Sequence, residues 1–224
     1  MSGHGLAGAT DAGAFLARLI QLDPTAVVRL RTGADDLTTV WARLPWSPLV
    51  CRTVTGPGPG DATVTAADLL AELDRSGDRL PNRRDADWRW PLPPDRGARV
   101  VERIPAADVL RIAASAASAL RSASTEGVAG RAVGERQLRD ALLDHVAIEV
   151  TEEGAGPQTR VEVSQRLVQA VVRMGFLGQP DRGTDDQVLV RTAGRWVGLS
   201  GSYGSAWLPR GKQLVIQTGR RPNG

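Results

Sequence analysis

Hydrophobic and polar positions in the first part of the chain follow two different periods. Residues 11–22 place apolar side chains three and four positions apart, which predicts an amphipathic helix. The runs 26–32, 37–44 and 49–55 are rich in β-branched residues and alternate in part with a period of two, and turn-forming segments separate them. A capping box beginning at Thr65 predicts a second helix. We therefore expect a helix, a three-stranded antiparallel meander and another helix.

A proline-rich connector follows this unit. Residues 76–97 contain four prolines and little periodicity, which indicates a boundary or an extended strap. Trp88 and Trp90 are interleaved with arginines there. These rings could form a stacking platform for single-stranded nucleic acid, or they could pin the strap across the seam between the two halves of the chain. We favour the second interpretation, which makes Trp88 and Trp90 candidate aromatic docking residues.

The second half of the chain has three stretches with helical periodicity, at 105–123, 135–145 and 162–176. Two β-type runs, at 187–191 and 195–199, come after them. Three helices and a hairpin in this order are typical of a winged helix.

The fold class expected from these patterns is α+β. Further strands are expected at 146–150 and 213–217, and residues 127–134 read as a flexible link. The expected organisation is a unit of helix plus three-stranded antiparallel meander over 1–77, a connector over 78–104, and a winged-helix-like helical unit with a C-terminal β-hairpin over 105–224.

The helix expected over 162–176 has a polar stripe. Glutamine pairs with adenine edges and arginine with guanine edges, so such a stripe is typical of a helix that reads the major groove, but also of an ordinary solvated helix face. The candidate nucleic-acid or partner contacts on this stripe are Gln165, Arg166, Gln169 and Arg173. The basic end of the chain adds Arg210, Lys212, Arg220 and Arg221.

The charge distribution argues against a general polyanion-binding surface. The formal net charge is +3, yet the last twenty residues alone carry four basic side chains and no acid. The rest of the chain is therefore nearly neutral, whereas nucleic-acid affinity depends on many Lys and Arg contacts with phosphates.

Groups that make or break covalent bonds do not gather in the sequence. With two histidines and one cysteine there is no zinc-ligand spacing, and no phosphate loop or nucleophile elbow is present. A Ser–His–Asp arrangement that uses Ser200 or Ser202 with His145 is conceivable but not favoured, and Cys51 in mid-strand is expected to be a buried small hydrophobe. We expect no catalytic residue, no cofactor and no metal.

Cellular location follows from what the chain lacks. No apolar run approaches the ~20 residues of a membrane span, and the first residues have no secretion-signal pattern. A single cysteine cannot form an internal disulfide. We expect a cytoplasmic protein without membrane contact.

Four segments resemble a family of uncharacterised actinobacterial proteins of about this length. The segments are RLPWSPLVCRTV (43–54), RRDADWRWPLPP (83–94), RLVQAVVRMGFLG (166–178) and GRWVGLSGSYG (194–204). Their motifs are hydrophobic and structural. The family has no assigned activity, so the resemblance implies two successive small domains in a bacterial cytoplasmic protein and implies no catalytic residue.

Three functional hypotheses follow. The leading one is a non-enzymatic binding or regulatory protein that acts through protein contacts. The alternative is a winged-helix DNA-binding protein, such as a transcriptional regulator, that contacts double-stranded DNA through the polar stripe and the basic end. The weakest is an enzyme with an unrecognised site between the two halves. The sequence predicts no oligomeric state.

Overall fold

The computed structural model describes residues 3–94, 96–126, 135–152, 159–178 and 186–210 of the chain. The first half contains helices and strands in the order α1 (Ala9–Leu22), β1 (Val27–Thr32), β2 (Leu37–Arg43), β3 (Leu49–Thr55), β4 (Asp61–Thr65) and α2 (Ala66–Asp74). A short 3₁₀ turn, η1 (Asp85–Asp87), lies in the strap that follows. The second half contains β5 (Arg99–Pro105), α3 (Ala106–Glu126), α4 (Glu135–Asp144), β6 (Val146–Glu152), β7 (Thr159–Ser164), α5 (Gln165–Arg173), β8 (Gln187–Ala193), β9 (Trp196–Gly201) and β10 (Gly204–Pro209).

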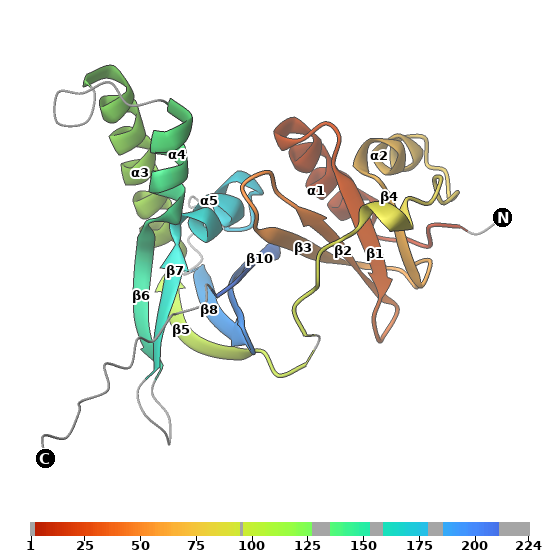
Figure 1. The fold of residues 1–224 in the computed structure, drawn as a ribbon. Coiled ribbons are helices and arrows are strands. Elements are labelled where there is room, and N and C mark those ends of the chain that lie inside the picture. Colours follow the sequence, from red (N-terminus) through yellow and green to blue (C-terminus); the bar gives the residue numbers. More distant parts are fainter. Residues whose placement is uncertain (1–2, 95, 127–134, 153–158, 179–185, 211–224) are drawn as a thin grey trace, which may run out of the picture.

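One antiparallel sheet of eight strands runs through both halves of the chain (Figure 1). Its strand order is β4-β1-β2-β3-β10-β9-β8-β5, and β6 with β7 forms a separate two-stranded sheet. The two halves meet where β3 pairs with β10, with Cys51 opposite Ser205 and Leu49 opposite Trp207. The backbone hydrogen bonds of this pair make the halves one continuous sheet.

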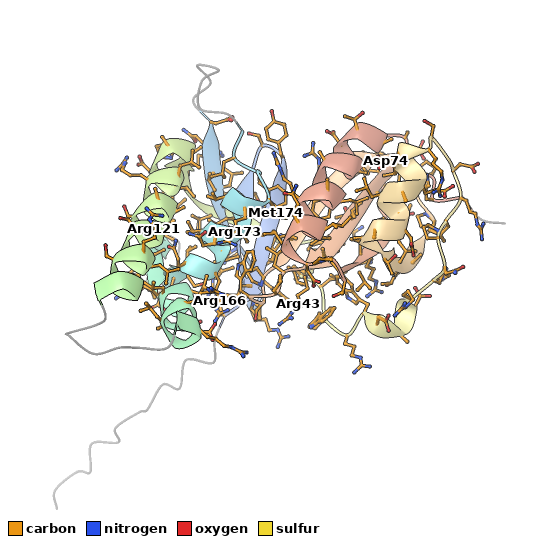
Figure 2. The ribbon with its side chains drawn as sticks, turned by 90° about the horizontal axis from the view of Figure 1, so that it is seen from above. Arg43, Asp74, Arg121, Arg166, Arg173 and Met174 are labelled. Carbon is orange, nitrogen blue, oxygen red and sulfur yellow. The ribbon has the colours of Figure 1, made fainter. Side chains whose placement is uncertain are left out.

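Four helices lie in a row across one face of the large sheet. Viewed from above, α3, α5, α1 and α2 follow one another from one end of the sheet to the other (Figure 2). Helix α5 lies in the middle of the row and contacts β9, β10 and α3. In the part of the chain that the structure describes, no helix is long and apolar enough to cross a bilayer.

Side chains of the central strands alternate between two buried faces. On β2, Val40 and Ala42 join the core under the helices, whereas Trp41 between them points to the opposite face. That face buries Trp196 and Trp207 beneath the strap. Because residues of a strand point alternately to its two faces, a strand that is covered on both sides buries consecutive residues.

A Schellman motif ends α5. Gly175 has a φ of +66°, its N–H donates to the Val172 carbonyl at 3.0 Å, and the Phe176 N–H donates to Val171 at 2.9 Å. The reversal turns Phe176 into the core, where its ring stacks on Phe15 of α1 at a centroid distance of 6.3 Å. This glycine is why α5 ends at Arg173, three residues before the end expected from the sequence.

The α+β class, the meander and the N-cap of α2 at Thr65 are confirmed. The Asp68 N–H donates to Thr65 Oγ1 at 3.3 Å, which is one half of a capping box, and the Thr65 hydroxyl donates to Asp68 Oδ2 at 2.6 Å. The expected link at 127–134 and the strand at 213–217 lie outside the described residues. The expected division of the chain at residues 77 and 104 stays a prediction.

The winged-helix description of residues 105–224 is not supported. The hairpin of β6 and β7 separates α4 from α5, and the strands after α5 are not a wing, because β8, β9 and β10 continue the eight-stranded sheet to β3. Two patterns misled the prediction. Pro105, expected as the first helical residue, is the last residue of β5, and residues 204–209, for which no strand was expected, form strand β10.

Candidate binding groove

A groove of about 900 Å³ lies on the helical side of the molecule. It lies between α3, α4 and α5, and the turn between β2 and β3 closes one side with Pro45 and Trp46. Half-buried apolar side chains line it, among them Leu120, Leu142 and Leu143. Four arginines and one aspartate add charge: Arg136, Arg139, Arg166, Arg173 and Asp140.

Arg166 ties three elements together and is not a free reading residue. Its Nε donates to Asp144 Oδ1 of α4 at 2.7 Å, and its Nη1 donates to the Trp46 carbonyl at 2.7 Å. The Trp46 indole N–H donates in return to the Arg166 carbonyl at 3.1 Å. The hydrogen bond from Arg166 holds the pKa of Asp144 below its ordinary value. Arg166 therefore fixes the turn at Trp46 against α5.

The other members of the predicted polar stripe have different surroundings. Gln165 is only 3% exposed, and Gln169 Nε2 lies 3.5 Å from the Ala113 carbonyl of α3. Arg173 is exposed, and its guanidinium lies 5.3 Å from the centre of the Trp46 ring. All four stripe residues line the groove (Figure 2 labels Arg166 and Arg173 on α5). The four side chains therefore face neighbouring elements inside the groove, and they do not form one continuous exposed stripe on α5.

Of the other sequence candidates, the described residues Trp88, Trp90 and Arg210 do not line this groove. The Arg210 N–H donates to the Arg195 carbonyl at 2.6 Å beside β10, while Lys212, Arg220 and Arg221 lie outside the described residues. Trp88 is buried on the strap face of the sheet, and its indole N–H donates to the Trp90 carbonyl at 2.7 Å. The two rings meet edge to face at a centroid distance of 5.5 Å.

Sequence reasoning missed the groove itself. Trp46 stands in a turn, and Leu142 and Leu143 stand on a short helix, so no local pattern joins them. The sequence does show that α4 has one apolar face, and such a face indicates a helix that packs on one side only. Pairing of that face with α3 and α5 depends on tertiary contacts.

We expect replacement of Arg166 by leucine to lower the free energy of unfolding by about 1–3 kcal/mol. The substitution removes two charge-assisted hydrogen bonds, and it leaves the half-buried Trp46 carbonyl without this donor. Urea unfolding of the full chain measures this. Arg111→Leu is the matched control, since Arg111 is 74% exposed and pairs with Asp108 on its own helix; it should change stability by less than about 0.5 kcal/mol. Equal, small losses in both variants would show that Arg166 does not hold the turn.

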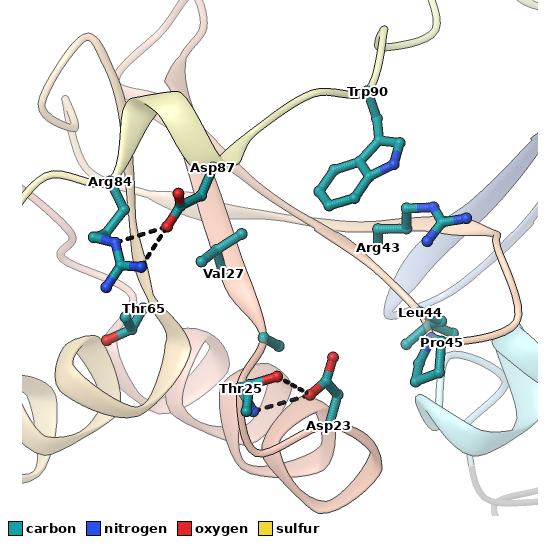
Figure 3. Close-up of a pocket in the computed structure, with 11 residues that line it drawn as sticks. Asp23, Thr25, Val27, Arg43, Leu44, Pro45, Thr65, Arg84, Asp87 and Trp90 are labelled. Carbon is teal, nitrogen blue, oxygen red and sulfur yellow. Dashed lines mark hydrogen bonds and ion pairs between the residues drawn. The ribbon is translucent and has the colours of Figure 1, made fainter.

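A smaller concavity of about 530 Å³ lies on the other side of Pro45 (Figure 3). Its charged groups are engaged by neighbouring residues. Arg84 Nε donates to Asp87 at 2.7 Å, and Asp23 accepts hydrogen bonds from Thr25. The Arg43 guanidinium lies 5.1 Å from the Trp90 ring centre. Two arginines and two aspartates line it, which gives this concavity no preference for ligands of either charge.

The groups considered for catalysis are not brought together. Ser202 Oγ donates to Asp186 at 3.0 Å, and Ser200 Oγ lies 2.8 Å from Ser205 Oγ. Neither concavity is lined by Asp144, His145 or Tyr203. Within the described ranges, no three His, Cys, Asp or Glu side chains cluster as a metal site would require.

Cys51 lies beneath the strap, and burial raises the pKa of its thiol to about 12. Because the thiolate is the reactive form, we expect no labelling of the native protein by a thiol reagent at pH 8 and complete labelling in denaturant. With a reagent that releases a chromophore for each thiol that it labels, the absorbance of the chromophore measures the extent of labelling. Rapid labelling of the native chain would contradict the burial of Cys51.

Two family models together match most of the chain. Residues 93–213 match the family described as Domain of unknown function (DUF8185), which is more than half of the sequence. The chain belongs to this family. Residues 5–91 match the model described as Domain of unknown function (DUF8010). No curated protein matches the sequence.

Solved structures similar to this chain are bacterial DNA polymerase sliding clamps. "Crystal structure of DNA polymerase sliding clamp from Pseudomonas aeruginosa with ligand" aligns with a TM-score of 0.53 and 10% identity, and covers 96% of this chain and 64% of the clamp. "Caulobacter crescentus pol III beta" aligns with a TM-score of 0.51 and 11% identity, over 90% of this chain and 63% of that one. The chain therefore spans less than two thirds of the length of these clamps. At such low identity the likeness shows a shared fold.

Proposed function

We propose that this protein is a non-enzymatic binding protein that acts through protein contacts, and that the groove between α3, α4 and α5 is its contact surface. The observation that carries the proposal is the groove itself, where apolar side chains of α3 and α4 are left half-buried beside a tryptophan and a set of arginines. Protein interfaces combine an apolar centre with a polar rim, and tryptophan and arginine are enriched where binding energy concentrates.

The fold supports a setting near DNA metabolism. The similar solved structures are named as DNA polymerase sliding clamps and polymerase III beta subunits. By analogy with these structures, we propose that the protein contacts of this chain are made with DNA-associated proteins.

The part of the helical face that α1 and α2 form favours a protein partner over direct DNA contact. Helices α1 and α2 together carry four acidic residues and one arginine. Phosphate contacts need a field of Lys and Arg, and an acidic stretch repels a duplex. On α5, Arg166 is engaged by Asp144 and Trp46, and Gln165 is buried, so neither residue is placed to read base edges.

The test is co-purification of the affinity-tagged full chain from its own cells, with nuclease treatment and mass spectrometry. Leu142→Glu places a charge among the apolar side chains of the groove. Leu37→Glu is its matched control, because Leu37 is 37% exposed on β2 in the first half of the chain. Arg173→Glu is a second groove variant, at an exposed position. Circular dichroism and thermal unfolding establish that all three variants fold.

We expect at least one protein to be retained by the wild type and Leu37→Glu after nuclease treatment, and to be lost from Leu142→Glu and Arg173→Glu. The recombinant form of that protein should then bind the wild type directly. Association that disappears with nuclease, or that all variants retain equally, would contradict the proposal.

A further inference from the structure

We infer that the groove receives an acidic amphipathic segment of a partner protein, whose apolar side chains lie on the leucines of the groove and whose carboxylates meet its arginines. This inference rests on the proposed function and adds the chemistry of the partner. Helix-in-groove recognition of this kind uses an apolar stripe for affinity and flanking charges for selectivity.

The groove is lined by more positive than negative side chains. Four arginines and one aspartate line it, and the carboxylate of Asp144 compensates Arg166 from just outside. Arg136 and Arg173 are both exposed, and neither has an ion pair with a carboxylate in the described part of the chain. The flat guanidinium of Arg173 over Trp46 leaves its N–H edges available to a carboxylate, which it can bind through two parallel hydrogen bonds.

Apolar side chains between these charges are left in contact with water. Leu120 of α3 and Leu142 and Leu143 of α4 are half-buried, and Trp46 is half-buried on the opposite side of the groove. A concavity with leucine and indole surface is the type of site that an apolar side chain of a partner fills. Together, these apolar side chains and the arginines beside them favour a segment with both apolar and acidic residues.

Gln165 supplies an independent indication of a polar occupant. It lines the groove at the first residue of α5, it is 3% exposed, and its amide nitrogen finds no hydrogen-bond partner among the described residues. Buried amide groups in proteins are nearly always paired. Because this nitrogen is buried, the Gln165 amide must turn toward the groove before a carbonyl or carboxylate oxygen of the partner can accept its hydrogen bond. The N-terminus of α5 favours a negative group at this position.

The basic end of this chain does not fit the groove. The residues after 210 include Lys212, Arg220 and Arg221 and no acid. Like charges would meet at Arg136 and Arg173, so an acidic segment from another protein is favoured over this segment of the chain.

The test uses three amphipathic helical peptides as probes and the full chain as receptor. The first peptide has leucines on one face and glutamates on the other, the second has lysines in place of the glutamates, and the third has serines in place of the leucines. Titration calorimetry measures affinity for the wild type, for the double variant Arg136→Glu/Arg173→Glu, and for Arg111→Glu. Arg111 is the matched control because it lies on α3 but does not line the groove.

We expect the wild type and Arg111→Glu to bind the glutamate peptide at least about tenfold more tightly than the lysine peptide, a difference of about 1.4 kcal/mol. The double variant should reverse this preference, and the serine peptide should not bind. The side-chain amide resonance of Gln165 should shift only with the glutamate peptide.

Three results would overturn the inference. The first is equal or tighter binding of the lysine peptide by the wild type, and the second is no binding of the glutamate peptide. The third is a concentration-dependent dimer that Arg173→Glu abolishes, which would make a second copy of this chain the occupant. If any of these appears while Leu142→Glu still removes the co-purified protein, the partner chemistry is wrong and the proposed function stands. If Leu142→Glu has no effect there, the proposed function fails.

Discussion

Replacement of Phe176 by alanine is expected to lower the free energy of unfolding by about 3–5 kcal/mol, as for other fully buried aromatic residues. Phe176 is 1% exposed, and its ring stacks on Phe15 of α1 with an interplanar angle of 4°. The Phe176 carbonyl also accepts the Tyr203 N–H at 3.1 Å. Truncation would therefore leave a cavity where α1, the end of α5 and the start of β10 meet.

Urea unfolding followed by circular dichroism measures this loss. Leu37→Ala is the control, because Leu37 is 37% exposed and its truncation creates no cavity; we expect less than about 1 kcal/mol from it. A single cooperative transition in both variants would show that the two halves unfold together. Two separated transitions in Phe176→Ala, or a loss equal to that of Leu37→Ala, would contradict a core shared across the seam.

Replacement of Gly198 by valine is expected to produce the second large loss, of about 1–3 kcal/mol. Gly198 on β9 is directly opposite Trp207 on β10. A Cβ atom at residue 198 would lie 2.5 Å from Trp207 Cε3 and 2.7 Å from Cδ2, which are atoms of the rigid ring. The indole must therefore move out of the core beneath the strap, and its fluorescence emission should shift to longer wavelength.

Gly13→Ala on α1 is the matched glycine control. A Cβ there would meet only Leu70 Cδ1 at 3.8 Å, an ordinary contact, and alanine is the better helix former. We expect this variant to gain about 0.5–1 kcal/mol. If Gly198→Val left both stability and tryptophan emission unchanged, the packing of Trp207 on the sheet would be wrong.

Local patterns were sufficient for most of the first half of the chain. The period-two alternation in 26–32, 37–44 and 49–55 gave the three strands of the meander, and the cap at Thr65 gave the start of α2. These features depend on neighbours in sequence, and period and cap chemistry report on such neighbours directly. The strand at Asp61–Thr65 was missed because it follows a glycine- and proline-rich loop without a clear boundary.

The second half required information that the sequence does not carry locally. Strand β5 is exposed over most of its length and lacks alternation, and β10 begins at a glycine whose φ is +156°. Both are strands only because β8, β9 and β3 pair with them. Pairing between residues as distant as Cys51 and Ser205 decided the fold, and so the order of helices and hairpin alone indicated the wrong architecture.

The candidate site shows the same limit. Arg166 and Arg173 were correctly singled out as polar residues of one helix, but their partners, Asp144 and Trp46, come from α4 and from a turn of the first half. Helical spacing predicts which residues share a face. It cannot predict that a tryptophan more than a hundred residues away closes that face into a groove.

Hydrogen–deuterium exchange on the full chain, with and without the protein recovered by co-purification, tests the groove as the contact surface most directly. The account predicts slower exchange in α4, in the middle of α3 and at the turn that carries Pro45 and Trp46, with α2 and β4 unchanged. Slower exchange confined to α1 and α2 or to the strap around Trp88, with the groove unaffected, would contradict it.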